Sequence, residues 1–198
     1  NNPGGILSEI GDLYSYLTDS AMVFTDKSEV ATKTSLLSGD YFKGGGVGIK
    51  VLKGIFDPVY VGYTFFKVKK AKDDKYYYAT SESRLKNRKP NAFEGKIYVL
   101  INGGSFSASC ILSSNLKGAK RATFVGEETG GTYNGTVAGR MPLIKLPHSK
   151  LKVRVGLMLI APYHKTDIEG RGIFPDVAIF PTLEDRINGI DPEMDWIL

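Results

Sequence analysis

Apolar residues recur at helical spacing near the start of the chain and predict an amphipathic helix over residues 6–17. The positions that repeat are Ile6, Leu7, Ile10, Leu13, Tyr14 and Leu17. Their three-to-four-residue period is that of one helix face. Gly4 and Gly5 directly precede this segment. A glycine turn would therefore deliver free backbone N–H groups to the helix N-terminus.

The centre of the chain predicts a strand, a helix and a second strand. The run KIYVLI at 96–101 is short and apolar, as in a buried parallel strand. A turn at 102–106 follows, and Ser107 to Leu116 predict a helix that Gly118 ends. Residues 121–126 predict the next strand. This order of elements predicts a right-handed parallel crossover.

Between these two regions the pattern is weaker. Residues 59–69 and 76–80 are rich in Tyr, Val, Phe and Thr and predict a β-hairpin, with the polar run 71–75 as its turn. The glycines within 44–48 predict a loop, and residues 81–95 predict another. No Gly-x4-Gly-Lys-Ser/Thr sequence occurs, so the glycine-rich stretch is not a Walker phosphate loop.

The C-terminal part predicts strands followed by two short helices. The strand segments are 143–146 and 151–160, antiparallel across a turn at 147–149, and then 174–179. Thr182 and Asp185 have the spacing of a capping box for a short helix that ends at Gly189. Asp191 and Pro192 open the last helix, because proline suits the first helical position.

Composition narrows the class of protein. With 198 residues, 42% hydrophobic and 24% charged, the chain is expected to form one soluble globular domain. No apolar stretch approaches the roughly 20 residues that span a bilayer. The net charge of +5 comes from scattered Lys and Arg, densest at 67–75 and 84–89. These indicate a solvated surface rather than a nucleic-acid interface.

The single cysteine and the chain start add two expectations. Cys110 allows no internal disulfide, and its apolar neighbours favour a buried structural thiol over a nucleophile. The sequence opens on the turn Asn-Asn-Pro-Gly-Gly with no initiator Met. Because a domain rarely starts on a turn without the strand that feeds it, we expect further residues upstream.

Ser107 is the first candidate for chemistry. It lies in a run of small residues, 103–109, at the start of a helix that follows a buried strand. The carboxyl ends of strands are where open α/β sheets bind ligands. Free N–H groups at the helix start could stabilise an oxyanion, as in a nucleophile elbow. A serine here can equally be a helix N-cap, so both interpretations stay open.

Four segments occur in the order found in the carboxyl-terminal processing (tail-specific) protease family. They are NNPGG at 1–5, VLINGGSFSAS at 99–109, RATFVGEETGG at 121–131 and EGRGIFPDVAI at 169–179. The chain resembles this family over residues 1–18 and 96–198. The resemblance implies an α/β, ClpP/crotonase-like protease core of ββα units, with the antiparallel hairpin as an insertion. It also implies one incomplete core domain over 1–198 with an insertion at about 19–95. Many members of the family carry a PDZ domain, and no segment of this sequence is a candidate for one.

The resemblance assigns roles by position. Ser107 matches the nucleophile, the backbone N–H groups of Gly5 and Ala108 match the oxyanion hole, and Glu169 matches a supporting glutamate. It implies hydrolysis of polypeptides through an acyl-enzyme. No cofactor, metal or nucleic acid is expected, and the oligomeric state stays open. Since relatives are mostly exported, a location in the cell envelope or periplasm is expected.

The general base is the weak point of this assignment. Thr132 stands where one branch of the family has the lysine of a Ser-Lys dyad, and Lys117 and Lys120 lie at the far end of the helix. The branch that includes the tricorn core protease takes a histidine from upstream sequence. The chain is closer to that branch. We therefore expect this chain alone to hydrolyse peptides poorly or not at all.

The two histidines of the chain are weaker candidates for the base. His148 lies in a predicted turn, where exposure is expected. His164 lies near the Glu169 loop and is a minor candidate contributor to the site.

Two other functions remain open. Modules of interphotoreceptor retinoid-binding protein share this fold and bind hydrophobic ligands without proteolysis. A degenerate scaffold is the third interpretation. The presence of Ser107, Gly5 and Glu169 together favours the enzyme.

Overall fold

The computed structural model describes residues 1–37, 58–59 and 61–198, which form two compact units. One unit, called the helix–sheet unit here, comprises residues 1–26, 81–136 and 161–198. The other, called the strand unit, comprises 27–80 and 137–160. The predictions of one core domain and of an insertion at 19–95 remain predictions.

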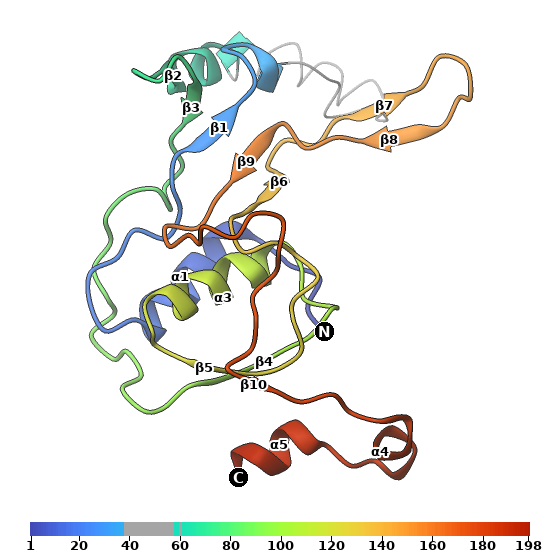
Figure 1. The fold of residues 1–198 in the computed structure, drawn as a ribbon. Helices are drawn as coiled ribbons and strands as arrows, with labels where there is room; N and C mark the ends of the chain where they lie inside the picture. Colours follow the sequence, from blue (N-terminus) through green and yellow to red (C-terminus); the bar gives the residue numbers. More distant parts are fainter. Residues whose placement is uncertain (38–57, 60) are drawn as a thin grey trace, which may run out of the picture. The chain divides into compact units, whose positions relative to one another are not determined.

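The helix–sheet unit is built on three parallel strands in the order β10-β5-β4. They are β4 (Tyr98–Ile101), β5 (Thr123–Gly126) and β10 (Val177–Ala178). The helices α1 (Leu7–Leu17) and α3 (Ala108–Gly118) lie together on one side of this sheet (Figure 1). The predicted parallel strand–helix–strand arrangement is confirmed as β4, α3 and β5.

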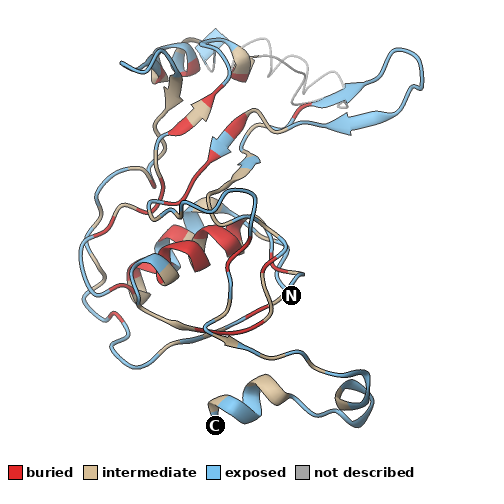
Figure 2. Ribbon diagram, in the orientation of Figure 1, coloured by how far each residue is buried: buried red, intermediate tan, exposed pale blue. Residues whose placement is uncertain are grey.

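The core of this unit lies between the helices and the sheet. Phe24, Ile111, Phe124, Val125 and Ile173 have at most 1% of their surface exposed. Figure 2 shows buried positions concentrated on α3 and on the segments beside it. Removing these apolar side chains from water is the main favourable term that holds the unit together.

A fully buried asparagine joins three segments of the helix–sheet unit. The Asn115 side-chain amide donates to the Phe24 carbonyl (2.7 Å) and to the Ile111 carbonyl (3.1 Å). Its Oδ1 accepts from the backbone N–H groups of Tyr163 (3.1 Å) and His164 (3.2 Å). Because every polar atom of this side chain is satisfied, its burial does not leave an unpaired group.

The two C-terminal helices form as predicted. In α4 (Leu183–Asn188), Thr182 and Asp185 make a reciprocal capping box, and Gly189 ends the helix in the left-handed region with φ 67°. The last helix, α5 (Pro192–Ile197), is capped by Asp191 and starts with proline. Both helices are mostly exposed (Figure 2).

The strand unit contains a five-stranded sheet in the order β2-β3-β1-β9-β6 and a separate β7–β8 hairpin. The sheet strands are β1 (Ser28–Val30), β2 (Val68–Lys70), β3 (Tyr76–Tyr78), β6 (Thr136–Ala138) and β9 (Met158–Ile160). The hairpin strands are β7 (Leu143–Lys145) and β8 (Lys152–Arg154). A 3₁₀ helix, η1, covers Ser35–Leu37.

The predicted strand at 59–69 is mostly wrong. Residues 58–59 and 61–67 are helical, and only 68–70 extend, as β2, to pair with β3. Within 61–67 Thr64 is the buried position, and the aromatic residues Tyr63, Phe65 and Phe66 are exposed. A strand packed on a core would bury alternate positions, so aromatic composition alone misleads here.

The predicted strand at 151–160 is in fact two strands. It breaks at 155–157, and β9 pairs with β1 rather than with β7. At Gly156 a Cβ would lie 2.7 Å from the Val137 backbone, so a close approach of two backbones requires glycine there. The strand predicted at 174–179 shrinks to β10 because Pro175 has no N–H to donate.

Two further expectations concern loops and membranes. The glycines at 44–48 fall outside the described residues, whereas 81–95 contain only the isolated bridge between Met22 and Lys86. Within the described part of the chain, no helix combines the length and the apolar character needed to cross a bilayer.

Candidate active site

A tight turn places Ser107 at the carboxyl end of β4. The side chain of Asn102 accepts from the Gly104 N–H (2.8 Å), and its carbonyl accepts from the Ser105 N–H (2.9 Å). The chain then enters α3, with Ser107 in the N-cap position. The nucleophile candidate is therefore held between a parallel strand and a helix, as the sequence predicts.

The backbone of Ser107 is in a conformation that disfavours every residue except glycine. Its φ is 55° and its ψ is −120°. Such strain costs about 1–3 kcal/mol and persists where the surroundings enforce it. The Ser107 side chain makes no capping hydrogen bond. Helix capping therefore does not account for a serine here, whereas a nucleophile elbow has this kind of strained turn.

The chain start lies directly against this turn. Asn2 pairs in parallel with Ser105, and its carbonyl accepts from the Phe106 N–H (2.9 Å) and the Ser109 hydroxyl (2.8 Å). At Gly4, with φ 110°, a Cβ would lie 2.7 Å from the Ser107 Cβ. Only glycine fits there without displacing Ser107.

Two helix N-termini therefore meet beside Ser107. Ala108 is the first residue of α3, and Gly5 follows Gly4 just before α1. Among the described residues, neither of their backbone N–H groups donates a hydrogen bond. Unpaired N–H groups at helix starts carry partial positive charge and attract anions. This is the chemistry an oxyanion requires.

A second loop supports the turn from behind. The Gly131 N–H donates to the Ser105 carbonyl (2.9 Å), and the Thr129 hydroxyl donates to the Gly131 carbonyl (2.8 Å) and accepts from the Ile173 N–H (2.8 Å). The buried Cys110 thiol also donates to the Ser105 carbonyl (3.2 Å). Burial raises the pKa of this thiol, as expected of a structural cysteine.

An ion pair fixes the next stretch of the same loop. Glu128 accepts from Arg171 at 3.0 and 2.5 Å and from the Gly172 N–H at 2.8 Å. The hydrogen bonds from Arg171 and from the Gly172 backbone lower the pKa of Glu128 to about 2. Nothing in the sequence pattern pointed to this pair, because its members lie far apart along the chain.

Glu169, the predicted supporting carboxylate, is exposed and contacts Asn134. Its Oε1 accepts from the Asn134 amide at 3.2 Å. The Asn134 side chain in turn donates to the Thr166 carbonyl and accepts from the Thr166 N–H. Within the described residues no hydrogen bond or ion pair joins Glu169 to Ser107. Its supporting role remains a prediction.

Comparison with known proteins now decides the family, because residues 1–179 match the sequence profile of peptidase family S41. The chain belongs to peptidase family S41. It is 36% identical over 98 residues to the carboxy-terminal-processing protease of Bartonella bacilliformis, an alignment that covers 50% of this chain and 21% of that protein. The resemblance to the carboxyl-terminal processing family is confirmed.

Solved structures show the same S41 fold. Mature CPAF bound to lactacystin aligns with a TM-score of 0.62 at 20% identity, over 99% of this chain and 41% of that one. Mature CPAF alone gives 0.58 at 18% identity, with the same coverage. The chain spans less than half the length of each of these relatives. The mixed α/β class is confirmed; the ClpP/crotonase-like description remains a prediction.

His164, the minor candidate for a contributor to the site, lies at the other end of α3 from Ser107. A Cβ on Gly118 would lie 2.3 Å from the His164 Cβ, so His164 packs against the last residue of α3. That end of the helix is about 15 Å from Ser107 at 1.5 Å per residue. His164 is therefore wrong as a contributor to the site. His148 lies exposed in the turn of the β7–β8 hairpin.

The candidate lysine positions also supply no base. Lys117 forms an ion pair with Asp176 at 2.5 Å, at the far end of α3. Thr132 donates its hydroxyl to the Gly135 carbonyl. In the part of the chain that the structure describes, the Ser107 hydroxyl bonds to no lysine, histidine or carboxylate. Nor do three His, Cys, Asp or Glu side chains gather there as metal ligands.

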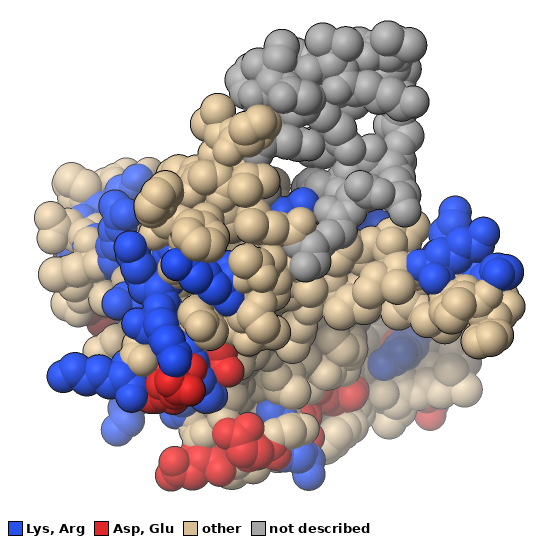
Figure 3. Space-filling view, turned by 90° about the horizontal axis from the view of Figure 1, so that it is seen from above, with Lys and Arg blue, Asp and Glu red and all other residues tan. Residues whose placement is uncertain are grey.

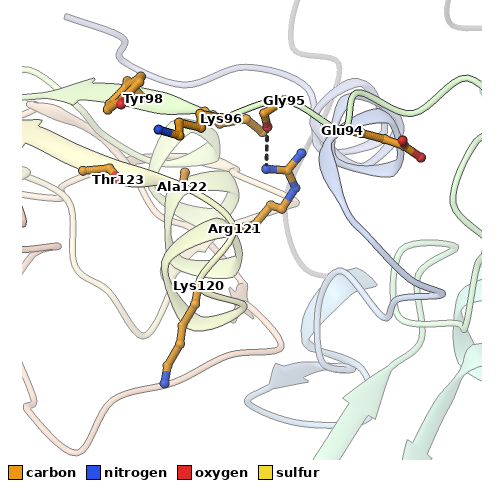
Figure 4. Close-up of a pocket in the computed structure, with 9 residues that line it drawn as sticks. Glu94, Gly95, Lys96, Tyr98, Lys120, Arg121, Ala122 and Thr123 are labelled. Atoms are coloured by element: carbon orange, nitrogen blue, oxygen red, sulfur yellow. Dashed lines mark hydrogen bonds between the residues drawn. The ribbon is translucent and has the colours of Figure 1, made fainter. Parts of the chain in front are cut away.

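A polar pocket of about 290 Å³ lies at the opposite end of the parallel strands (Figure 4). Its lining comprises Glu94, Gly95, Lys96, Ile97, Tyr98, Lys120, Arg121, Ala122 and Thr123. Arg121 reaches over it to donate to the carbonyls of Gly95 (3.0 Å) and Phe93 (2.6 Å). Ser107 follows the carboxyl ends of the strands, so this hollow is separate from the Ser107 site.

Proposed function

We propose that this chain is the nucleophile-bearing part of a serine peptidase of the carboxyl-terminal processing type, which cleaves polypeptides through an acyl-enzyme on Ser107. The observation that carries the proposal is the Ser107 backbone, strained at φ 55° while its side chain caps nothing. Strain of this kind clusters at functional sites. Membership of peptidase family S41 supports the same chemistry.

The proposed mechanism follows from the two helix starts. The Ser107 Oγ attacks the scissile carbonyl carbon, and the carbonyl oxygen becomes an oxyanion. The N–H groups of Gly5 and Ala108 donate to that oxygen, where one such donor is worth about 10²–10³ in rate. The amine then leaves with a proton, and water releases the acyl group from Ser107. Glu169 is proposed to support the site from the loop that holds Asn134.

The proton on Ser107 needs a base that its described contacts do not include. We propose that this base is not among the residues that contact Ser107 here, and that the isolated chain therefore turns over slowly or not at all. A serine without a base is a weak nucleophile near neutral pH. The branch that takes its base from upstream sequence fits better than the Ser-Lys branch because Thr132 stands at the position of the dyad lysine.

The fold is proposed to be the ClpP/crotonase-like core of the family, with ββα units. The substrate is an extended polypeptide, and the protein is exported to the cell envelope, as the family resemblance implies. The alternative function, binding of a hydrophobic ligand, would need an apolar cavity, and the pocket described above, lined by Lys96, Lys120 and Arg121, is not one.

The experiment compares cleavage of unfolded casein by the full-length gene product and by its Ser107→Ala variant. The matched control is Ser20→Ala, at an exposed serine outside the site. We expect cleavage by the parent and by the control, and none by Ser107→Ala. Equal cleavage by Ser107→Ala would refute the nucleophile, and robust Ser107-dependent cleavage by the isolated 198-residue chain would refute the missing base.

A further inference from the structure

The β7–β8 hairpin has one wholly apolar face. Ile144 pairs with Val153, and the Leu146 N–H donates to the Leu151 carbonyl (2.8 Å), which places those two opposite each other. Paired residues at alternate positions share a face of a two-stranded ribbon. These four side chains are 39–64% exposed. Large apolar side chains gathered on an exposed face mark an interaction site.

The opposite face of the hairpin is basic. Lys145 pairs with Lys152, and Arg154 pairs with Leu143. Between Glu128 and Asp167 the sequence contains no acidic residue, and none of these three cations forms an ion pair within the described residues. Figure 3 shows Lys and Arg gathered on the hairpin, at the right of that view, without Asp or Glu among them. The basic face of the hairpin therefore has a positive electrostatic potential.

Every residue of β7 and β8 is exposed. β7 and β8 pair with each other, and the ladder continues through hydrogen bonds from Val155 N–H to the Pro142 carbonyl and from Leu157 N–H to the Arg140 carbonyl. The hairpin is therefore the outer end of the ribbon that contains β6 and β9. A partner that contacts both faces of this hairpin must have apolar groups and anionic groups about 10 Å apart, which is the thickness of one ribbon.

We propose that the β7–β8 hairpin docks on an anionic lipid surface. The boundary between headgroups and acyl chains presents negative charge and apolar depth about 5–10 Å apart. Ile144, Leu146, Leu151 and Val153 enter that boundary. The long stems of the lysines and of Arg154 let their charged ends reach the phosphates. A polyanion without apolar groups, such as polyglutamate, would neutralise the basic face and leave the apolar one in water.

The test measures sedimentation of the 198-residue chain with lipid vesicles. One set holds phosphatidylcholine alone and the other holds about 30% phosphatidylglycerol, each at about 0.1 M and 0.5 M NaCl. We expect binding only to the anionic vesicles and a marked loss at high salt. Far-UV circular dichroism of each variant checks that it has folded.

Variants then separate the two faces. Lys152→Glu with Arg154→Glu should lower the partition coefficient about tenfold or more, at several-fold per cation. Ile144→Ser with Leu151→Ser should lower it about 10²-fold or more. The matched control reverses two exposed cations, Lys69 and Lys72, near the β2–β3 turn and makes the same change in net charge. It should change binding less than about twofold.

Three results would overturn the proposal. The first is equal partition onto both kinds of vesicle, or onto neither. The second is a control variant that loses as much binding as the Lys152/Arg154 variant. The third is unchanged binding by the Ile144/Leu151 variant together with displacement by polyglutamate, which would assign the hairpin to an acidic polypeptide instead.

Discussion

Because the Ser107 backbone is strained, glycine should be the most stabilising residue at that position. Relief of a backbone with φ 55° and ψ −120° is worth about 1–3 kcal/mol. Glycine lowers the stability of the folded state by about 0.5–1 kcal/mol, because it loses more conformational entropy on folding than alanine. Ser107→Gly should therefore be more stable than Ser107→Ala by up to about 2.5 kcal/mol, and neither variant carries the hydroxyl.

The control for this comparison is Ser8, an exposed residue in α1. In a regular helix glycine is less stable than alanine by about 0.5–1 kcal/mol. The glycine variant should thus be the more stable one at position 107, and the alanine variant the more stable one at position 8. The assay is urea unfolding of all four variants; for a chain of this length, 1 kcal/mol moves the melting temperature by about 2–4 °C.

The reasoning fails if alanine is the more stable residue at both positions. The Ser107 backbone would then be unstrained, and the main structural support for a nucleophile elbow would be lost. A more stable glycine variant at Ser107 and a more stable alanine variant at Ser8 would support a strained turn at Ser107, held by the surrounding contacts, as is found at functional sites.

Three further predictions concern contacts around the site. Gly4→Ala puts a Cβ 2.7 Å from the Ser107 Cβ and should lower casein cleavage by the full-length protein about 10²-fold, measured as kcat/KM; near-normal turnover would contradict the assigned role of the glycine turn. Asn115→Ala leaves the His164 N–H without its partner, whereas the Tyr163 N–H still donates to the Phe24 carbonyl, and it should lower the free energy of unfolding by about 1–3 kcal/mol, measured with urea; a loss below about 0.5 kcal/mol would contradict it. Glu128 has a pKa lowered to about 2, so its pairing stabilises the fold above the ordinary carboxyl pKa near 4.5 and is lost as the pH falls towards 2. Glu128→Gln should flatten the pH dependence of stability over that window, and an unchanged slope in pH-dependent melting would argue against the ion pair.

Much of the helix–sheet unit could be predicted because its signals are local. The helix at 6–17 appears as Leu7–Leu17, and the capping residues of α4 act within a few positions of one another. Ser107 was found because a buried strand, a small-residue turn and a helix follow in order. Such patterns depend on backbone propensity and period, which a sequence displays directly.

What could not be predicted depends on contacts between distant segments. The position of Asn2 on the Ser105 turn and the pairing of Glu128 with Arg171 join residues that no period relates. His164 is close to Glu169 in sequence, yet its packing against Gly118 places it at the wrong end of α3. At 61–67, aromatic composition indicated a strand where tertiary burial of Thr64 selects a helix.

The most direct test of Ser107 as the nucleophile is to map a covalent adduct. The full-length gene product would be treated with a fluorophosphonate, digested and sequenced by tandem mass spectrometry. The account predicts one phosphonyl group on the Ser107 hydroxyl, absent after Ser107→Ala and reduced by Gly4→Ala. An adduct on another residue, or none on folded full-length protein that cleaves casein, would contradict it.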